Sequence, residues 1–233
     1  MVGNAATWAL ASPPRHIAIE GPIGVGKTTL ARALAARLGG RTALEAPGDN
    51  PFLERFYAQP GAWALPTQLC FLLQRVRQAR DLVQADMFAS TVVSDFMVEK
   101  DKIFAQLTLA ADELGLYTQV YDEIMGGLPV PDLVLYLHAD TQQLLGRIAT
   151  RAIDYEQSIE STYLEALGRA YGRFFGDYRA APVVIIDTST LNFAAGGGAV
   201  DGLLTALLKV RHGRYFYDAD GLHGGAPSPG AGM

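Results

Sequence analysis

Residues 16–30 read HIAIEGPIGVGKTTL, a short apolar run that passes through glycines into sequence of helical character. The spacing GxxxxGK(S/T) is met by Gly21, Gly26, Lys27 and Thr28, with a predicted strand before it and a predicted helix after it. Glycines let the chain bend through backbone angles closed to other residues and bring bare N–H groups up to phosphate oxygens. We therefore interpret residues 21–28 as a phosphate-binding loop rather than an ordinary glycine-rich turn.

The residue types in this loop predict the groups it binds. The helix that starts near Lys27 adds unpaired N–H groups and a positive dipole end, which favour an anion. Lys27 can reach the β- and γ-phosphates of ATP, and the Thr28 hydroxyl is a candidate ligand for Mg²⁺. The expected nucleotide-binding residues are Gly21, Gly24, Gly26, Lys27, Thr28 and Thr29.

Length and composition restrict the class of protein. A chain of 233 residues with 49% hydrophobic content can bury a full core in one domain. A net charge of −5 argues against a nucleic-acid-binding surface, which needs basic patches. The single cysteine excludes an intrachain disulfide, and no segment is long and apolar enough to span a bilayer. We expect a cytoplasmic protein that binds neither nucleic acid nor membrane.

Short apolar runs alternate with helical patterns along the chain, which indicates an α/β fold with a parallel sheet covered on both faces. The expected strands are 16–20, 41–45, 90–94, 132–138 and 182–186. The sequence thus predicts a five-stranded parallel sheet of the P-loop NTPase type. We expect a flexible arm at 1–14, one domain at 15–213, and a disordered tail rich in Gly and Pro at 214–233.

Ligands of parallel sheets bind outside the carboxyl ends of the strands, so residues that follow strands are site candidates. Glu45 and Asp95 follow the second and third predicted strands, and Arg147 to Glu156 follow the fourth strand and its helix. A switch GTPase would need an Asn-Lys-x-Asp motif, which the sequence lacks. A motor ATPase would usually carry an acidic pair, whereas Asp95 is followed by Phe96. A small-molecule kinase needs an acceptor pocket and a lid with arginines, and the chain offers candidates for both.

Several blocks in order carry a family resemblance. They are the phosphate-binding loop, Glu45-Ala46-Pro47, NPFLERFY at 50–57, WALPTQ at 63–68, and the stretch from Ser94-Asp95-Phe96 to Ala105. Together they resemble the deoxynucleoside kinases, and most closely the bacterial deoxyadenosine and deoxyguanosine kinase branch. The likeness runs from about His16 to the final predicted helix.

This resemblance implies transfer of the ATP γ-phosphoryl group to the 5′-hydroxyl of a deoxynucleoside in nucleotide salvage. Glu45 then matches the carboxylate that accepts the proton of that hydroxyl, Tyr57 a tyrosine that binds the sugar 3′-hydroxyl, and Gln68 an amide at the base edge. Without the resemblance, these would be a solvated strand-end acid, a packed aromatic and an exposed polar residue. A glutamine amide pairs with purine or pyrimidine edges, so a purine is favoured only by the branch resemblance.

Other substrate-side residues also follow from the resemblance. Asp95 matches an acid that can hold Mg²⁺, directly or through water. The family has an arginine after this acid, and here Phe96 stands in its place, which removes a guanidinium from that position. Phe71 and Trp63 are candidates to wall the base, although a role in the core is equally compatible with the sequence.

The resemblance also implies an arginine-bearing lid at about 147–160. Arg147 and Arg151 lie four residues apart on one helical face, where they could stabilise charge on the moving phosphoryl group or form a solvated face. Ile153 replaces a further family arginine, and Glu156 matches a lid acid near the sugar 3′-hydroxyl. The loop at 187–193 corresponds to the family's adenine-binding loop. Long helices favour a homodimer.

Two other functions remain compatible with the sequence. A nucleoside monophosphate kinase would need an extra arginine near Tyr57, and Arg55 lies to one side of it. A P-loop ATPase or regulatory nucleotide-binding module would need no acceptor at all.

Overall fold

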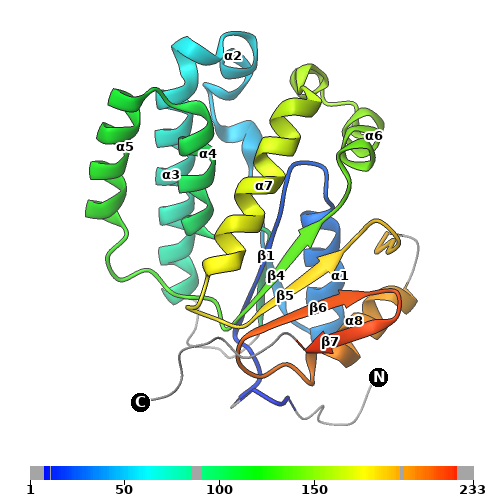
Figure 1. Ribbon diagram of the computed structural model, residues 1–233. Coiled ribbons are helices and arrows are strands. Elements are labelled where there is room, and N and C mark those ends of the chain that lie inside the picture. Colours follow the sequence, from blue (N-terminus) through cyan, green and yellow to red (C-terminus); the bar gives the residue numbers. More distant parts are fainter. Residues whose placement is uncertain (1–7, 11, 85–90, 195–196, 225–233) are drawn as a thin grey trace.

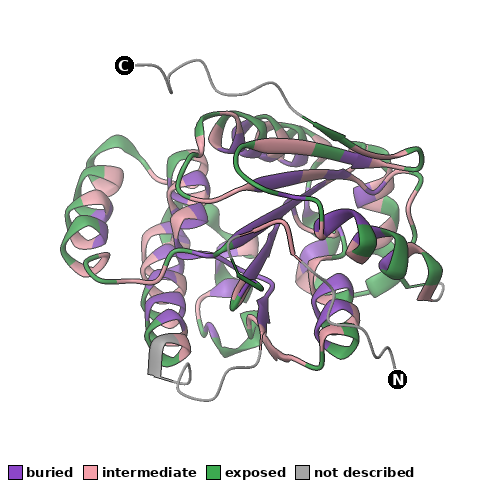
Figure 2. Cartoon of the chain, turned by 90° about the horizontal axis from the view of Figure 1, so that it is seen from below, coloured by how far each residue is buried: buried purple, intermediate pink, exposed green. Residues whose placement is uncertain are grey.

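The structure is a computed structural model that describes residues 8–10, 12–84, 91–194 and 197–224. A sheet runs through the centre and helices cover both of its faces (Figure 1). In a view turned by 90°, the strands are mostly buried and the outer sides of the helices are exposed (Figure 2). This is the layered α/β architecture that the alternating strands and helices predict.

The sheet has seven strands in the order β2-β3-β1-β4-β5-β6-β7. Each neighbouring pair from β2 to β6 is parallel, and β7 is antiparallel to β6. The strands are β1 (His16–Glu20), β2 (Arg41–Ala43), β3 (Val92–Ser94), β4 (Leu133–His138), β5 (Val183–Asp187), β6 (Arg214–Asp218) and β7 (Gly221–Gly224). The five predicted strands are present, but the sheet is larger than predicted.

The prediction of a disordered tail from residue 214 is wrong for residues 214–224, which form β6 and β7. Tyr215, Phe216 and Tyr217 are aromatic residues that favour extended structure, and the Tyr217 side chain is buried in the core. A composition rich in Gly and Pro over the whole segment hides this short aromatic run. Residues 225–233 lie outside the described residues.

The predicted loose arm is also wrong where the structure describes it. Trp8 packs against the main core, and the Ala9 N–H donates to the Leu208 carbonyl at 2.8 Å. An indole side chain removes much apolar surface from water when it docks, which favours attachment of this segment. Residues 1–7 lie outside the described residues.

The helices agree with the sequence pattern to within a few residues at most ends. They are α1 (Lys27–Leu38), α2 (Leu53–Ala58), α3 (Pro60–Gln84), α4 (Asp101–Thr108), α5 (Ala111–Ile124), α6 (Thr141–Arg151), α7 (Ser161–Asp177) and α8 (Gly197–Leu207). Among the described residues, the 3-10 turns η1 (Pro47–Asp49), η3 (Val98–Lys100) and η4 (Asp154–Ser158) stand between them. Helix α3 begins at Pro60 and contains Pro66 in its interior, a position that sequence rules treat as a helix boundary.

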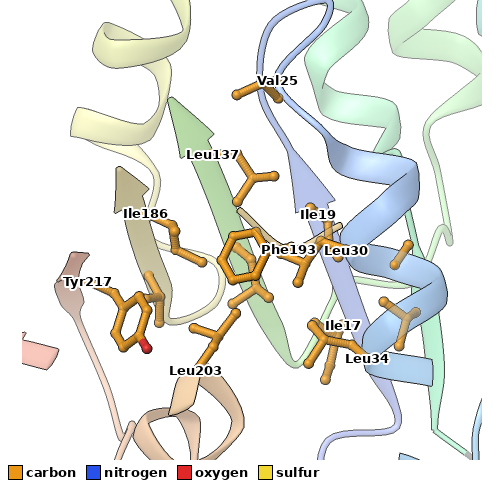
Figure 3. Packing of buried hydrophobic residues seen from close by; sticks show 14 of the residues in the cluster. Ile17, Ile19, Val25, Leu30, Leu34, Leu137, Ile186, Phe193, Leu203 and Tyr217 are labelled. Atoms are coloured by element: carbon orange, nitrogen blue, oxygen red, sulfur yellow. The ribbon is translucent and has the colours of Figure 1, made fainter. Parts of the chain in front are cut away.

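Side chains alternate across the sheet and divide the core in two. Ile17 and Ile19 of β1 point to the face covered by α1 and α8, where they meet Leu30, Leu34 and Leu203 (Figure 3). Ala18 of β1 points to the other face, which α4 and α7 cover. Helices α3 and α5 pack beyond α4 around a third apolar cluster. Strands buried on both faces explain why their sequences are continuously apolar.

The arrangement fixes where a ligand can bind. The strand arrows of β4 and β5 point toward the end of the molecule that carries α2 and α6 (Figure 1). The loop between β1 and α1 lies at this same end, as expected for the carboxyl edge of a parallel sheet. Within the described residues, no helix combines the length and apolarity needed to cross a membrane.

Candidate active site

The β1–α1 loop has the backbone of a phosphate cradle. Gly21, Gly24 and Gly26 adopt φ angles of 146°, 80° and 104°. A Cβ at Gly21 would lie 2.3 Å from the Leu137 carbonyl oxygen of β4, so a larger residue cannot fit there. Gly26 caps α1, whose first N–H groups begin at Lys27. The loop therefore presents backbone donors and a helix N-terminus at one place, as the sequence predicts.

Lys27 holds its ammonium group over the loop. Its Nζ donates to the carbonyls of Gly21 at 2.8 Å and Pro22 at 3.1 Å. Desolvation, and next the positive charge of Lys100, lower the pKa of Lys27 to about 8. Thr29, predicted to join the site, is exposed on α1 one residue beyond Thr28.

Asp95 connects the loop to Glu45. The Thr28 hydroxyl donates to Asp95 Oδ2 at 2.5 Å, and the Glu45 backbone N–H donates to Asp95 Oδ1 at 2.8 Å. Thr28, Asp95 and Glu45 come from three neighbouring strand ends, those of β1, β3 and β2. The structure thus brings these three predicted residues together in one hydrogen-bonded chain.

Glu45 belongs to a buried network of charges that the sequence analysis missed. Its Oε1 accepts from Arg75 Nε, and Lys100 Nζ lies 2.9 Å from the same oxygen. Arg75 also binds Asp101 through Nη1, and Lys100 Nζ lies 3.4 Å from Oε1 of Glu20. Arg75, Lys100, Asp101 and Glu20 are each at most 6% exposed. One signal was available, since Gln68, Phe71 and Arg75 share a helical face by their spacing.

The network determines the charge of Glu45. Desolvation alone would raise the pKa of Glu45, but the positive charges of Arg75 and then Lys100 outweigh it and lower this pKa to about 2. The carboxylate is therefore ionised at neutral pH and can accept a hydrogen bond from a hydroxyl. It is not a solvated strand-end acid, because two buried cations hold it.

A cavity of about 320 Å³ opens at Glu45. Its lining residues are Glu45, Ala46, Asp49, Phe71, Gln74, Arg75, Arg77 and Gln78. Phe71 packs beneath the Arg75 guanidinium, with 4.7 Å between the guanidinium carbon and the ring centroid. This volume is within the range of small-molecule sites, and Phe71 forms an aromatic wall of it. Trp63 instead packs in the apolar cluster between α2 and α3.

Gln68 is buried rather than exposed. It is 4% exposed, and its Nε2 donates to the Thr108 hydroxyl at 3.2 Å. At the other end of α4, Asp101 Oδ2 is a buried acceptor that has no hydrogen-bond partner among the described residues. Buried polar atoms without partners are rare in folded proteins. Asp101 Oδ2 is therefore a hydrogen-bond acceptor at the α3–α4 interface that no described protein group uses.

The predicted lid region lies against α2. Tyr155 of η4 stacks on Tyr57 with ring centroids 5.3 Å apart. Arg151 is paired with Glu156, which is 8% exposed. Tyr57 therefore packs against the core and also contacts the lid segment that carries Glu156.

The two lid arginines have different partners. Arg147 donates to the Val25 carbonyl of the phosphate loop at 3.2 Å and to the Thr188 carbonyl after β5 at 2.7 Å. It thereby bridges the phosphate loop and the predicted adenine loop, whereas Arg151 faces Glu156 on the acceptor side. Arg147 is part-buried, which excludes a purely solvated helix face for this residue.

Comparisons with known proteins agree with this geometry. The family model described as deoxynucleoside kinase matches residues 17–204. The chain is 38% identical over 154 residues to deoxyguanosine kinase of Bacillus subtilis (strain 168), covering 65% of this chain and 73% of that protein. It is 28% identical over 204 residues to deoxyadenosine/deoxycytidine kinase of the same organism, covering 84% and 93%.

A solved structure has the same fold. Deoxyadenosine kinase from M. mycoides with bound dATP superposes with a TM-score of 0.72 at 22% identity, covering 82% of this chain and 98% of that chain. The family match spans both the phosphate loop and the lid segment. The chain therefore belongs to the deoxynucleoside kinase family, whose members are ATP-dependent phosphotransferases acting on deoxynucleosides.

Proposed function

We propose that Glu45 accepts the proton of the deoxynucleoside 5′-hydroxyl while that oxygen attacks the γ-phosphorus of ATP. One observation carries this proposal: an ionised carboxylate faces a cavity and is joined through Asp95 to Thr28 of the phosphate loop. A base must lie within hydrogen-bond reach of the proton that it takes, and a Glu45 carboxylate that lines the cavity could meet this requirement.

In the proposed transfer, a bond forms between the 5′-oxygen and the γ-phosphorus, and the bond from that phosphorus to the β–γ bridging oxygen breaks. The hydroxyl proton passes to Glu45, and ADP and the deoxynucleoside 5′-monophosphate are the products. Phosphoryl transfer depends mainly on positioning and charge stabilisation, which the loop N–H groups and Lys27 supply on the donor side.

Thr28 and Asp95 fit a Mg²⁺ site that includes the substrate phosphates. Within the described ranges, no cluster of three or more His, Cys, Asp and Glu side chains could hold a metal by itself. Mg²⁺ is often bound through one or two carboxylates together with phosphates and water, so a single Asp–Thr pair suits it. The ion would neutralise charge between the β- and γ-phosphates.

We further propose that residues 147–160 are a lid over both substrates. The support is the double attachment of this segment: Arg147 binds the donor loop, and Tyr155 stacks on Tyr57 of the acceptor side. Arg151 would turn from Glu156 toward the phosphates, and Glu156 and Tyr57 would then be available to the sugar 3′-hydroxyl. A lid that is held at both the phosphate loop and Tyr57 would cover the two substrates and exclude water from the reacting groups.

A purine deoxynucleoside is the proposed acceptor in nucleotide salvage. The relatives from Bacillus subtilis are named deoxyguanosine kinase and deoxyadenosine/deoxycytidine kinase, and each name includes a purine nucleoside. Phe71 offers a face for stacking, and Gln68 with the unpartnered Asp101 Oδ2 offers hydrogen-bonding groups for a base edge. Base edges that leave such groups unpaired would bind less well.

A cytoplasmic homodimer is the proposed state of the protein. Leu73 of α3 and Leu116 of α5 are 52% and 50% exposed, and both belong to the helical layer outside α4. Large exposed leucines on long helices are suited to helix packing between two copies. The single cysteine is compatible with a reducing compartment.

The Glu45→Gln variant tests the proposed base. We expect kcat to fall by roughly a hundredfold or more, because general-base catalysis contributes about 10²–10⁴-fold, while deoxynucleoside binding changes little. Single-turnover kinetics and equilibrium binding measure the two quantities. Glu123→Gln, which removes a carboxylate from an exposed position on α5, is the matched control and should keep the wild-type rate. A wild-type rate in Glu45→Gln would remove Glu45 from this role.

A further inference from the structure

Position 96 does not supply a charge to the site. Phe96 follows Asp95 and is 2% exposed, and its apolar side chain is enclosed by protein. The guanidinium that the resemblance places after the acid is therefore absent, and no cation reaches Glu45 from this position.

Lys100, four residues after Phe96, supplies a positive charge beside Glu45. The η3 turn carries Lys100 back toward the sheet, where its ammonium nitrogen lies 2.9 Å from Glu45 Oε1 and 3.4 Å from Glu20 Oε1. Lys100 is 2% exposed. A lysine is almost never fully buried unless it is paired, and removing its charge from water is expensive.

Neither carboxylate needs Lys100 as its only partner. Glu45 already binds Arg75. Glu20 already accepts hydrogen bonds from the Met97 N–H at 2.7 Å and the Tyr171 hydroxyl at 3.1 Å. A buried salt bridge is weak evidence for stability, so charge pairing alone does not account for an ammonium placed between them.

We propose that Lys100 is a positioning residue for phosphoryl transfer, which holds the Glu45 carboxylate beside the phosphate loop in place of the arginine that Phe96 replaces. The proposal rests on the role of Glu45 given above. It assigns to Lys100 a function that acts through Glu45 and not through contact with either substrate.

The second partner of Lys100 explains how it can do this during the reaction. When Glu45 takes the hydroxyl proton, its negative charge is lost and its attraction for Lys100 weakens. Glu20, at the end of β1 and next to the loop, still holds the ammonium group. Lys100 thus stays in place when Glu45 becomes neutral, and the Glu45 carboxyl group keeps its position beside the phosphate loop.

Lys100→Met tests the proposal, since it removes the charge and keeps a long apolar stem. We expect kcat to fall roughly tenfold to a hundredfold, as for a misplaced reacting group, with deoxynucleoside KM changed by less than about threefold. Lys100→Arg should recover a substantial part of the rate. Lys102→Met removes a lysine from the next helix, where it is 42% exposed and paired with Asp122, and should keep the wild-type rate.

The folded fraction of each variant separates positioning from a structural role. Loss of folded protein lowers the rate in proportion to the fraction that is folded, whereas a misplaced Glu45 carboxylate lowers kcat in protein that is fully folded by thermal unfolding. A kcat of Lys100→Met that returns to the wild-type value once it is corrected for the folded fraction would contradict the proposal.

A double-mutant cycle with Glu45→Gln distinguishes the two levels of the account. If Lys100 acts through Glu45, adding Lys100→Met to Glu45→Gln should cost less than about threefold. Full activity in Glu45→Gln would refute the proposed base. A slow Glu45→Gln with a wild-type Lys100→Met, or full additivity, would refute the role of Lys100 and leave the base intact.

Two further variants keep the test decisive. Lys100→Gln retains a hydrogen-bond donor between the carboxylates and is measured where the Met variant does not fold, as judged by thermal unfolding. Phe96→Arg combined with Lys100→Met returns a cation from position 96, and at least a partial recovery of kcat is expected. No recovery, in a variant that folds and binds ATP, counts against a shared role for the two positions.

Discussion

The chemistry of single residues in this site depends on which charges share the same buried space. Glu20 and Glu45 both lie near Lys100, yet burial raises the pKa of Glu20, whereas Arg75 and Lys100 overcome burial and lower that of Glu45 to about 2. Pairs of titratable groups whose environments push their pKa values apart commonly have separate roles. Here the difference supports the proposed role of Glu45 as the proton acceptor.

The lowered pKa of Lys27 predicts how ATP use depends on pH. Its pKa of about 8 lies below the usual value for a lysine, so in the free enzyme it is protonated below this pH and neutral above it. An uncharged Lys27 binds phosphates less well, and kcat/KM for ATP reports the free enzyme. We expect kcat/KM for ATP to decline as pH rises through about 8.

The Lys27→Arg variant is the control for the decline of kcat/KM above pH 8, because a guanidinium stays charged throughout the measured pH range. Its activity should be lower, since the geometry changes, but the decline near pH 8 should disappear. A decline that begins only near pH 10, or one that persists in the arginine variant, would show that Lys27 does not titrate as described.

At the scale of elements, the strands and helices that carry the site could be predicted because each has a strong local signal. β1, the phosphate loop and the start of α1 at Lys27 follow from the glycine spacing and from the apolar run before it. Strand β6 could not be predicted in this way. Its burial depends on pairing with β5, a contact that composition does not reveal.

Strand β6 allows a sharp test of its contribution to the fold. Tyr217 is 8% exposed within the main core, while its neighbour Phe216 points away and is 48% exposed. We expect Tyr217→Ala to reduce the free energy of unfolding by about 3 kcal/mol, as for other buried aromatic truncations. Denaturant unfolding monitored by circular dichroism measures this.

Phe216→Ala is the matched control on the opposite side of the same strand, and it should change the free energy of unfolding by less than about 1 kcal/mol. Equal, small effects of the two substitutions would mean that β6 does not pack on the core in solution.

The network around Glu45 shows where prediction from sequence stopped. Glu45, Asp95 and Thr28 were found because each follows a strand or lies in a motif. Arg75 and Lys100 belong to α3 and η3, and their approach to Glu45 depends on how these elements pack against the sheet. Charged residues on a helix are usually solvated, so their type and spacing alone did not mark them as buried.

At the scale of the whole molecule, the proposed reaction divides the site at the sheet edge into a donor half and an acceptor half. The β1–α1 loop and Arg147 would form the donor half, and Glu45 with the α3 cavity would form the acceptor half. Asp95 links them through Thr28 and the Glu45 backbone. The family match covers both halves, which is why a transferase reaction with two substrates follows rather than hydrolysis alone.

The most direct measurement is transfer of label from ATP, radiolabelled at the γ-phosphate, to each of the four deoxynucleosides and to their monophosphates, with wild-type protein and Glu45→Gln in parallel. The account predicts labelled 5′-monophosphates, formed fastest from a purine deoxynucleoside, and a roughly hundredfold slower reaction in Glu45→Gln. Transfer of label only to the added monophosphate acceptors, giving labelled diphosphates, would contradict it, as would ATP hydrolysis that no acceptor accelerates or equal rates for the two proteins.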